Sequence, residues 1–229
     1  DPKSSVRMLQ AYSVDGVIVA SSTLPAGFSR AFRDAGVPVV HSFGRYSSQP
    51  HVDIVGINNI ECGRMAASEL IKRNYRSVAF LGGPEAATST QDRLQGFSEE
   101  MAKRPDISVS HSYAEDYTFE AGRAEMQRLL KEDYSEAYFC GDDVLSVGAL
   151  SAISDAGLSV PDDIGVIGFN DMEMARWQNI NLTTIHQPID AIINASIDKV
   201  VATLDDPDQE PESQLFPCHV IERGTLRRL

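Results

Sequence analysis

Short runs of apolar, often β-branched residues recur along the chain, and most of them are continuously apolar rather than alternating with polar residues. A continuous run of this kind is typical of a strand that is covered on both faces, as the strands of parallel sheets are. We therefore predict strands of parallel sheets over the following ranges: Val17–Ala20, Val37–His41, Ile54–Ile57, Val78–Leu81, Ala137–Cys140 and Ile164–Phe169.

Apolar residues between these runs recur with helical spacing. After Asn58 they form one face of a predicted helix, where Asn58 and Glu61 resemble a capping box and Asn74 suits the left-handed C-terminal cap. Gly157 suits the same kind of cap for the predicted helix that ends at Ala156. Helices are predicted after Asn58 and over these further ranges: Lys3–Tyr12, Gln91–Lys103, Phe119–Lys131, Val144–Ala156 and Pro188–Leu204. Strands that alternate with helices indicate βαβ units, so the sequence predicts a doubly wound α/β fold.

The predicted helix at Lys3–Tyr12 leads into the strand at Val17–Ala20, but no strand precedes it in the sequence. A parallel βα unit begins with a strand that pairs with the next one. We therefore expect this chain to be a piece of a longer protein in which the first strands of one sheet are missing.

The composition is that of a globular protein with an acidic surface. Hydrophobic residues make up 42% and charged residues 23% of the 229 residues, and no apolar run reaches the roughly 18 residues of a membrane span. Lys and Arg number 20 against 33 Asp and Glu, which gives a net charge of −13 at pH 7. Because a negative field repels phosphate groups, we expect this chain to bind neither nucleic acid nor a membrane by itself.

The sequence contains no familiar catalytic or metal-binding motif. Cys62, Cys140 and Cys218 are far apart, unlike the paired cysteines of a structural zinc site, and an odd number of cysteines favours a reducing compartment. No signal peptide is visible, so we expect a cytoplasmic protein. The motifs GxGxxG, GxxxxGK[ST], HExxH and GxSxG are absent, and no two histidines are spaced i, i+4. We predict no cofactor, no metal site and no catalytic residue.

Polar side chains directly follow several of the predicted strands. Ligands of open α/β sheets bind outside the carboxyl ends of the strands, and these side chains are therefore candidates for binding one. Asp142 and Asp143 follow the strand at Ala137–Cys140 and open a helix, while Asn170 follows the strand at Ile164–Phe169. One of the two aspartates suits the N-cap of the helix, and the other is free to face a ligand.

Nine segments, spread over nearly the whole chain, together resemble the motifs of one protein family and occur in the family's order. They are DGVIVASS (Asp15–Ser22), VPVV (Val37–Val40), VGINNIECGRMAASELI (Val55–Ile71), VAFLGGP (Val78–Pro84), DRLQGF (Asp92–Phe97), FCGDDVLSVGAL (Phe139–Leu150), VPDDIGVIGFND (Val160–Asp171), LTTIHQP (Leu182–Pro188) and ERGT (Glu222–Thr225). The sequence thus resembles the effector-binding core of LacI/GalR-type bacterial transcription regulators. Periplasmic sugar-binding proteins share the fold of this family.

The resemblance implies two Rossmann-like subdomains with parallel sheets, the type I periplasmic-binding-protein-like fold, linked by three crossovers. The implied N-terminal subdomain comprises residues 1–82 and 188–206, and the implied C-terminal subdomain comprises residues 84–186 and 213–229. The crossovers are accordingly expected near residues 82–84, 186–188 and 206–213. The helix-turn-helix DNA-binding domain of full-length members is absent from this chain.

The resemblance also implies which residues contact the effector. The family uses an Arg in the motif resembling DRLQGF, the residue before the helix-opening Asp, and the first polar residue after the GF strand end, which are Arg93, Asp142 and Asn170 here. Many relatives have Asp at the last of these positions, so Asn170 departs from the pattern. Asp143 matches the helix-opening Asp and is expected to cap the helix. Four more positions match residues that line the site: Ser22, Arg45, Tyr117 and Trp177.

The function implied is that of the ligand-sensing and dimerisation core of a DNA-binding transcription regulator, a non-enzyme. A small effector, expected to be a monosaccharide or a derivative, would bind between the subdomains and control operator binding through the missing domain. A purine is the main competitor as effector. The alternative function is a periplasmic sugar-binding receptor of a transport system, and an enzyme is disfavoured because no pair of nucleophile and base is evident.

The resemblance further implies a homodimer that pairs through the helices at Ile60–Ile71 and Val144–Ala156. Small residues on these helices are expected to permit close approach of the partner: Gly63, Ala66, Ala67, Gly148, Ala149 and Ala152.

Overall fold

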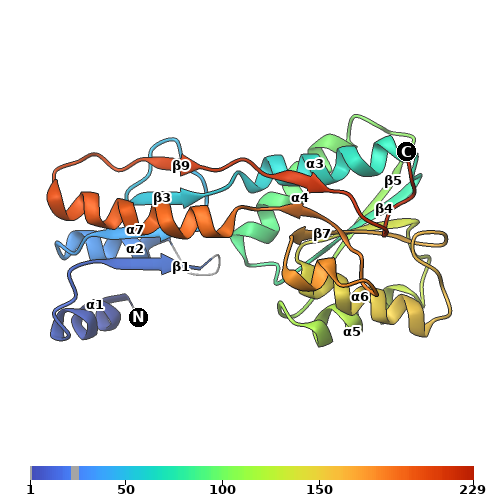
Figure 1. Cartoon of the computed structure of the whole chain (residues 1–229), viewed down its shortest axis with the longest axis horizontal. Helices are drawn as coiled ribbons and strands as arrows, with labels where there is room; N and C mark the ends of the chain where they lie inside the picture. The colour runs from blue at the N-terminus through green and yellow to red at the C-terminus, as the bar shows by residue number, and fades with distance from the viewer. Residues whose placement is uncertain (1, 22–25) are drawn as a thin grey trace. The chain divides into compact units, whose positions relative to one another are not determined.

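The computed structural model describes residues 2–21 and 26–229, which form two compact units, each built around its own sheet. Unit 1 comprises Asp1–Asn58 and Pro188–Pro217, and unit 2 comprises Asn59–Gln187 and Cys218–Leu229. The chain therefore passes between the units three times, and the α/β fold with two Rossmann-like subdomains is confirmed (Figure 1).

The sheet of unit 1 has four parallel strands in the described residues, in the spatial order β1 (Val17–Ala20), β2 (Val39–Ser42), β3 (Asp53–Gly56) and β9 (Ser213–Leu215). Helices α1 (Pro2–Ala11) and α2 (Ala26–Asp34) share a core with Val39 of β2. Successive side chains of a strand point to opposite faces, so Ser42 points to the other face from His41. There it hydrogen-bonds to Ser196 of α7 (Ile189–Asp205), which covers that second face.

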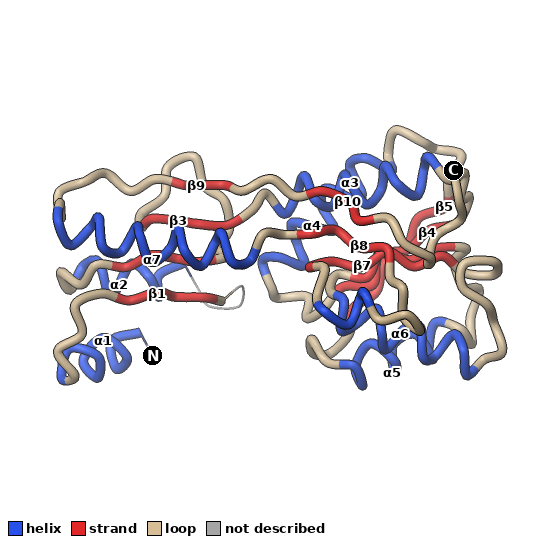
Figure 2. The backbone as a smooth tube through the Cα atoms, in the orientation of Figure 1, coloured by secondary structure: helices blue, strands red, loops and turns tan. Residues whose placement is uncertain are grey.

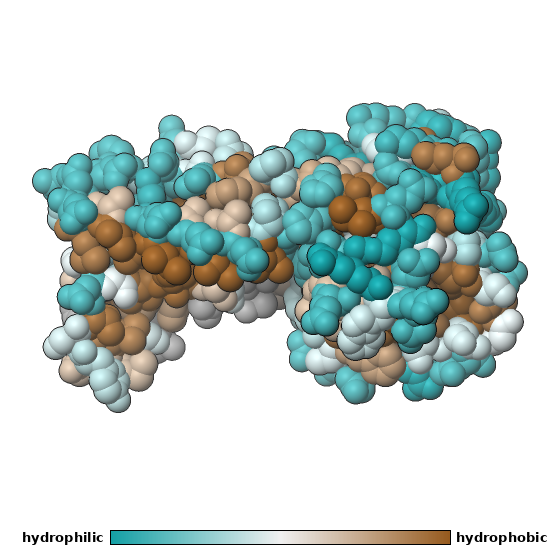
Figure 3. Space-filling view, in the orientation of Figure 1, coloured by the Kyte–Doolittle hydropathy of each residue, from teal (hydrophilic) through white to brown (hydrophobic). Residues whose placement is uncertain are grey.

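Helix α7 has apolar residues on two faces. Ile192 and Ser196 are fully buried, so their side of the helix faces the sheet. Ile193 and Leu204 are instead 43% and 42% exposed. The exposed apolar side chains form a band along α7 (Figure 3) and comprise Ile189, Ile193, Ile197, Val201 and Leu204.

The sheet of unit 2 has six strands in the spatial order β10 (His219–Ile221), β8 (Thr183–His186), β7 (Gly165–Asn170), β6 (Ala137–Cys140), β4 (Ser77–Gly82) and β5 (Ser108–Tyr113). All of its pairs are parallel except the antiparallel pair of β10 with β8. The helix pair α3 (Asn59–Lys72) and α4 (Thr88–Met101) and the pair α5 (Phe119–Leu129) and α6 (Asp143–Asp155) lie on opposite faces of this sheet (Figures 1 and 2).

The core of unit 2 follows from the alternation of side chains along its strands. Phe80 of β4 packs with Phe97 of α4 and with Phe139 of β6, with ring centroids 5.3 to 6.3 Å apart. Leu81, the next residue of β4, belongs to the cluster that contains Leu145 of α6. Each central strand is thus covered on both faces, which is why its sequence is continuously apolar.

Two of the predicted crossovers lie at other positions in the structure. Residues 59–82 belong to unit 2 rather than to the N-terminal subdomain, because β4 pairs with β5 and β6 and α3 packs against α4. Residues 213–217 belong to unit 1, because β9 pairs with β3. The crossover between Gln187 and Pro188 lies within the predicted range.

Local predictions agree well with the structure where they rest on local signals. Asn74 and Gly157 adopt positive φ angles of 59° and 75° after their helices, as left-handed caps require. Helix α2 and strands β5, β8, β9 and β10 were not predicted. The sequence of β5 is SVSHSY, and this edge strand exposes its first four residues. It therefore lacks the continuous apolar run by which the other strands were predicted. None of the described helices is long and apolar enough to cross a membrane.

The paired helices of unit 2 approach each other at glycines. A Cβ atom at Gly96 of α4 would lie 1.8 Å from the carbonyl oxygen of Ile60, and one at Gly63 of α3 would lie 2.1 Å from that of Arg93. Gly148 of α6 meets the carbonyl of Phe119 in the same way, at 2.2 Å. Only a residue without a side chain permits backbones to come this close.

The small residues expected to face a partner subunit therefore pack against other helices of the same chain. All six are buried in unit 2, because α3 packs on α4 and α6 packs on α5 of the same chain. The prediction that these residues admit a partner helix was wrong for Gly63, Ala66, Ala67, Gly148, Ala149 and Ala152.

We predict that Gly96→Ala lowers the free energy of unfolding by about 1–3 kcal/mol, because the new methyl group must displace the backbone of Ile60. The matched control is Gly27→Ala on the exposed surface of α2, where an added Cβ has no neighbour within 4 Å. This control is expected to be neutral or stabilising by up to about 1 kcal/mol. Urea unfolding of both variants measures the difference, and equal losses would contradict the close packing of α3 on α4.

Candidate functional site

Three of the predicted site residues, Arg93, Asp142 and Asn170, form one linked group in unit 2, which we call the polar group. They come from three different elements. Asp142 stands at the start of α6 and Asn170 at the end of β7, where Asn170 Nδ2 donates to Asp142 Oδ2 at 2.7 Å. Arg93 of α4 donates from Nη1 to the carbonyl of Gly141, the residue before Asp142, at 2.6 Å. The structure thus brings a guanidinium, a carboxylate and an amide together at the carboxyl ends of β6 and β7.

Arg93 is held rigidly by its surroundings. The residue is only 7% exposed, and its Nε donates to Oδ1 of Asn59 in the first turn of α3 at 2.9 Å. The guanidinium carbon lies 3.6 Å from the centre of the Phe169 ring, a cation–π contact. Burial lowers the pKa of Arg93, but an arginine remains charged at any physiological pH. The side chain is therefore a fixed positive group that contacts α3, the residue two positions before α6, and β7.

Asp142 both caps a helix and takes part in the polar group. Its Oδ1 accepts the backbone N–H of Val144 at 2.7 Å, as an N-cap does, and its Oδ2 accepts from Asn170. Burial raises the pKa of Asp142 above its usual range, while the Val144 N–H and the charge of Arg93 partly offset this. The prediction that Asp143 is the cap was wrong, because Asp143 points into the protein instead.

Asp143 is fully buried and joins three segments. Its Oδ1 accepts the hydroxyl of Thr184 on β8 at 2.6 Å, and its Oδ2 accepts the N–H of Met172 at 2.7 Å. Burial raises the pKa of Asp143 to about 7, although both hydrogen bonds favour the charged form. The two neighbouring aspartates therefore have different roles: Asp142 belongs to the polar group, whereas Asp143 is buried and connects α6 to β8 and to Met172.

The segment after β7 has a strained backbone that positions Asn170. Asn170 and Asp171 have φ angles of 111° and 55°, a region that residues with side chains rarely adopt and that costs on the order of 1–3 kcal/mol. Ion pairs of Asp171 with Arg223 at 2.5 Å and with Arg176 at 2.9 Å hold this conformation.

Gln187 belongs to the polar group but was not among the predicted site residues. Its Nε2 donates to Oδ1 of Asn170 at 2.5 Å. It follows β8 (Thr183–His186) directly, so the rule that selected Asp142 and Asn170, the carboxyl ends of parallel strands, also applies to it. The strand itself was not predicted, and the residue was missed for that reason.

Tyr117 lies beside the first turn of α4. Its hydroxyl hydrogen-bonds to Thr90 Oγ1 at 2.7 Å and to Ser89 Oγ at 3.2 Å. The ring covers Gly83, where a Cβ atom would lie 2.3 Å from a ring carbon. Thr90 stands one helical turn before Arg93 on α4, so the hydrogen bond to Thr90 places Tyr117 near Arg93.

Of the other predicted lining residues, Trp177 belongs to unit 2 and Arg45 to unit 1. Trp177 is 53% exposed, and its carbonyl accepts from the N–H of Asn181, two residues before β8 begins. The amino end of β8 is at the opposite edge of the parallel sheet from Asp142 and Asn170, so Trp177 does not join them. Arg45 is exposed in the loop after β2 of unit 1, and Ser22 lies outside the described residues.

The polar group suits a ligand with several hydroxyl groups. The guanidinium only donates, the carboxylate only accepts, and the amides of Asn170 and Gln187 do both, so together they match groups that donate and accept at once. Within residues 2–21 and 26–229 no group of three or more His, Cys, Asp or Glu side chains is arranged to hold a metal ion.

Known proteins with the same fold include several transcription regulators. The sequence profile of the periplasmic binding protein-like domain matches residues 67–226. The HTH-type transcriptional repressor PurR of Escherichia coli is 30% identical over 230 residues, which cover 98% of this chain and 67% of the repressor.

Two solved structures share the fold at a TM-score of 0.85. The transcriptional regulator CelR in complex with cellobiose is 27% identical, over 98% of this chain and 69% of that chain. A LacI family transcriptional regulator from Enterococcus faecalis with bound ribose is 24% identical, over 100% of this chain and 83% of that chain.

The two units and the polar group at the strand ends therefore define a periplasmic-binding-protein-like domain. Within that class, the chain belongs to the LacI family of transcription regulators, and it corresponds to their effector-binding core.

We predict that Asp143 makes the stability of the protein depend on pH. The folded pKa is about 7 and the unfolded pKa is about 3.9, so between these values the native state holds a proton that the unfolded state has lost. The contribution of Asp143 to stability therefore falls as pH rises through this window. The free energy of unfolding of wild type minus that of Asp143→Asn should decrease from pH 5 to pH 7, by at most about 1.4 kcal/mol per pH unit. A difference that does not change with pH would contradict a protonated Asp143.

Proposed function

We propose that this chain is the ligand-sensing and dimerisation core of a cytoplasmic, DNA-binding transcription regulator and is not an enzyme. A small effector, a monosaccharide or a derivative of one, binds Arg93, Asp142 and Asn170, with Gln187 as a further contact. Effector binding controls the affinity of the attached DNA-binding domain for its operator. The observation that carries this proposal is the linked polar group in unit 2.

A sugar suits this group better than a flat base does. A nucleobase would need aromatic faces free for stacking. One face of Phe169 is taken by the guanidinium of Arg93, and the ring of Tyr117 covers Gly83. The proposal is also supported by structurally similar regulators that hold ribose or cellobiose.

Control of operator binding requires two conformations to which the effector binds with different affinity. The strained backbone at Asn170 and Asp171 is a suitable place for such a difference, because hydrogen bonds to an effector at Asn170 act directly on it. The same fold serves solute receptors of transport systems. The match to a repressor over 98% of this chain favours the regulator over that alternative.

We predict that Asp142→Asn weakens effector binding by about 10- to 100-fold, because a hydrogen bond to a charged group contributes about 1.5–3 kcal/mol. The substitution keeps an oxygen that can cap Val144, but it puts an NH2 group in place of the oxygen that accepts from Asn170, so we expect a lower melting temperature and compare binding where both proteins are folded. A thermal-shift screen of pentoses, hexoses, their phosphates and purines identifies the effector, and calorimetry then compares the variants.

The matched control for this experiment is Trp177→Ala, which removes an exposed side chain at the other edge of the sheet and should leave the affinity unchanged. Arg93→Ala is a poorer test because Arg93 also supports Asn59 and Gly141, so loss of binding would be mixed with loss of stability. Stabilisation by a purine alone, or sugar binding that Asp142→Asn leaves intact, would refute the assignment.

We also propose that the chain forms a homodimer. Although the small residues of α6 are buried within the chain, Val144 and Val147 of that helix are only partly buried and leave an apolar surface. Sedimentation equilibrium at micromolar concentration should show a species of about 50 kDa, twice the 25.0 kDa of the chain, and Val147→Asp should shift it towards the monomer because it places a charge in an apolar contact. A monomer alone in the wild type would contradict the proposal.

A further inference from the structure

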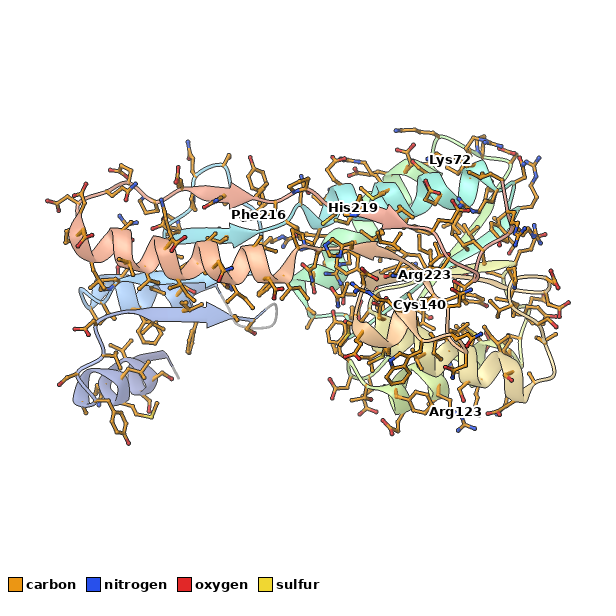
Figure 4. The ribbon with its side chains drawn as sticks, viewed as in Figure 1. Lys72, Arg123, Cys140, Phe216, His219 and Arg223 are labelled. Atoms are coloured by element: carbon orange, nitrogen blue, oxygen red, sulfur yellow. The ribbon has the colours of Figure 1, made fainter. Side chains whose placement is uncertain are left out.

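The side chain of Arg223 holds both ends of the loop that joins β7 to β8. This loop comprises residues 171–182 of unit 2. Arg223, which follows β10 and is labelled in Figure 4, donates from Nη2 to Oδ1 of Asp171 at 2.5 Å and from Nη1 to the carbonyl of Leu182 at 2.7 Å. A guanidinium is planar and presents its donors at a fixed spacing, so a single side chain fixes the distance between the two loop ends.

Arg223 is buried, whereas the second arginine on Asp171 is not. The side chain of Arg223 is 14% exposed and Asp171 is buried, so water competes little for their ion pair. Arg176 also donates to Asp171, at 2.9 Å, but its side chain is 61% exposed. An exposed ion pair contributes little, because water screens it and a long side chain must be ordered to form it. Arg223 is therefore the stronger of the two partners.

The loop begins with the strained turn that carries Asn170. Asn170 and Asp171 have φ angles of 111° and 55°, and such angles persist only where the surroundings fix them. The side chain of Asn170 hydrogen-bonds to Asp142 and Gln187 in the polar group. The side chain of Asp171 instead contacts Arg223. An effector that bonds to Asn170 competes with the first two contacts but not with the third, so Arg223 can hold the turn before and after binding.

We propose that Arg223 is a positioning residue of the effector site, which keeps Asn170 in its binding conformation by fixing both ends of the loop. This role rests on the proposed function, in which Asn170 contacts the effector. Arg223 lies in the segment that begins at Cys218, after the third crossover, so this segment acts on the site although Arg223 itself does not touch the effector. Residues without contact to a ligand can change its affinity in this way.

The segment and the loop also have attachments that do not involve the guanidinium. The N–H of Arg223 donates to Thr183 Oγ1 at 2.9 Å, and β10 pairs with β8. The N–H of Met172 in the loop donates to Asp143 Oδ2 at 2.7 Å. Replacement of the Arg223 side chain should therefore relax the turn at Asn170 without unfolding unit 2.

The first measurement is the three-bond coupling between the amide proton and the α proton of Asn170, which reports φ and needs no effector. Wild type should give the value of a positive φ near 111°. Arg223→Lys keeps a positive charge beside Asp171 but replaces the planar fork by a single ammonium, which does not hold both loop ends. Its coupling should move towards that of a negative φ, which residues with side chains favour. Arg176→Lys is the matched control and should keep the wild-type coupling.

The second measurement is the affinity for whichever of ribose, glucose and cellobiose binds wild type most tightly. Arg223→Lys should weaken this affinity by about 2- to 30-fold at a temperature where a thermal melt shows both proteins to be folded. Arg176→Lys should weaken it by less than about 2-fold. In an Asp171→Asn background, Arg223→Lys should cause a smaller further loss, because the ion pair through which it acts is already removed. Asn tolerates a positive φ, so this background keeps the turn accessible.

Three results would overturn the proposal: a wild-type coupling that fits a negative φ, an unchanged coupling in Arg223→Lys, or full additivity of the substitutions at Asp171 and Arg223. Should Arg223→Lys not fold, Asp171→Asn takes its place in both measurements, because it removes the same ion pair from the other side. If none of the three sugars binds wild type, that result counts against the proposed function, whereas the coupling of Asn170 still decides the role of Arg223.

Discussion

The buried guanidinium of Arg93 is the interaction on which the candidate site depends. It joins α4 to Asn59 of α3, to the carbonyl of Gly141 before α6, and to the ring of Phe169 on β7. A charged group inside a protein is costly unless hydrogen bonds and polarisable neighbours replace its hydration. Because Arg93 has these partners only when all three elements are in place, the charge and the local fold require each other.

The close packing of the helices makes this arrangement of Arg93 possible. Gly63 and Gly96 allow α3 and α4 to touch along their backbones, and the carbonyl of Arg93 itself is the atom that a side chain at Gly63 would strike. Asn59 of α3 is thereby brought within reach of Arg93 Nε. Gly63, which was expected to face a partner subunit, instead helps to build the support of the site.

Two adjacent aspartates show how this environment gives the same kind of side chain different roles. Asp142 faces the polar group and caps α6, whereas Asp143 is buried against Thr184 and Met172. Position relative to a few fixed groups thus gives two chemically identical side chains different properties.

The sequence by itself determined the fold class, the central strands, the caps at Asn74 and Gly157, and the places of Asp142 and Asn170 after strands, whereas Arg93 was expected only from the family resemblance. These features rest on local signals, namely continuous apolar runs, positive-φ residues after helices, and polar residues directly after strands. Only the tertiary structure decided which sheet β4 and β9 join, that Asp142 rather than Asp143 is the cap, and that Gln187 belongs to the group and Trp177 does not. A sequence pattern reports whether a residue is buried and in which conformation. The partner that buries it comes from distant parts of the chain, and only packing and strand pairing in three dimensions select that partner.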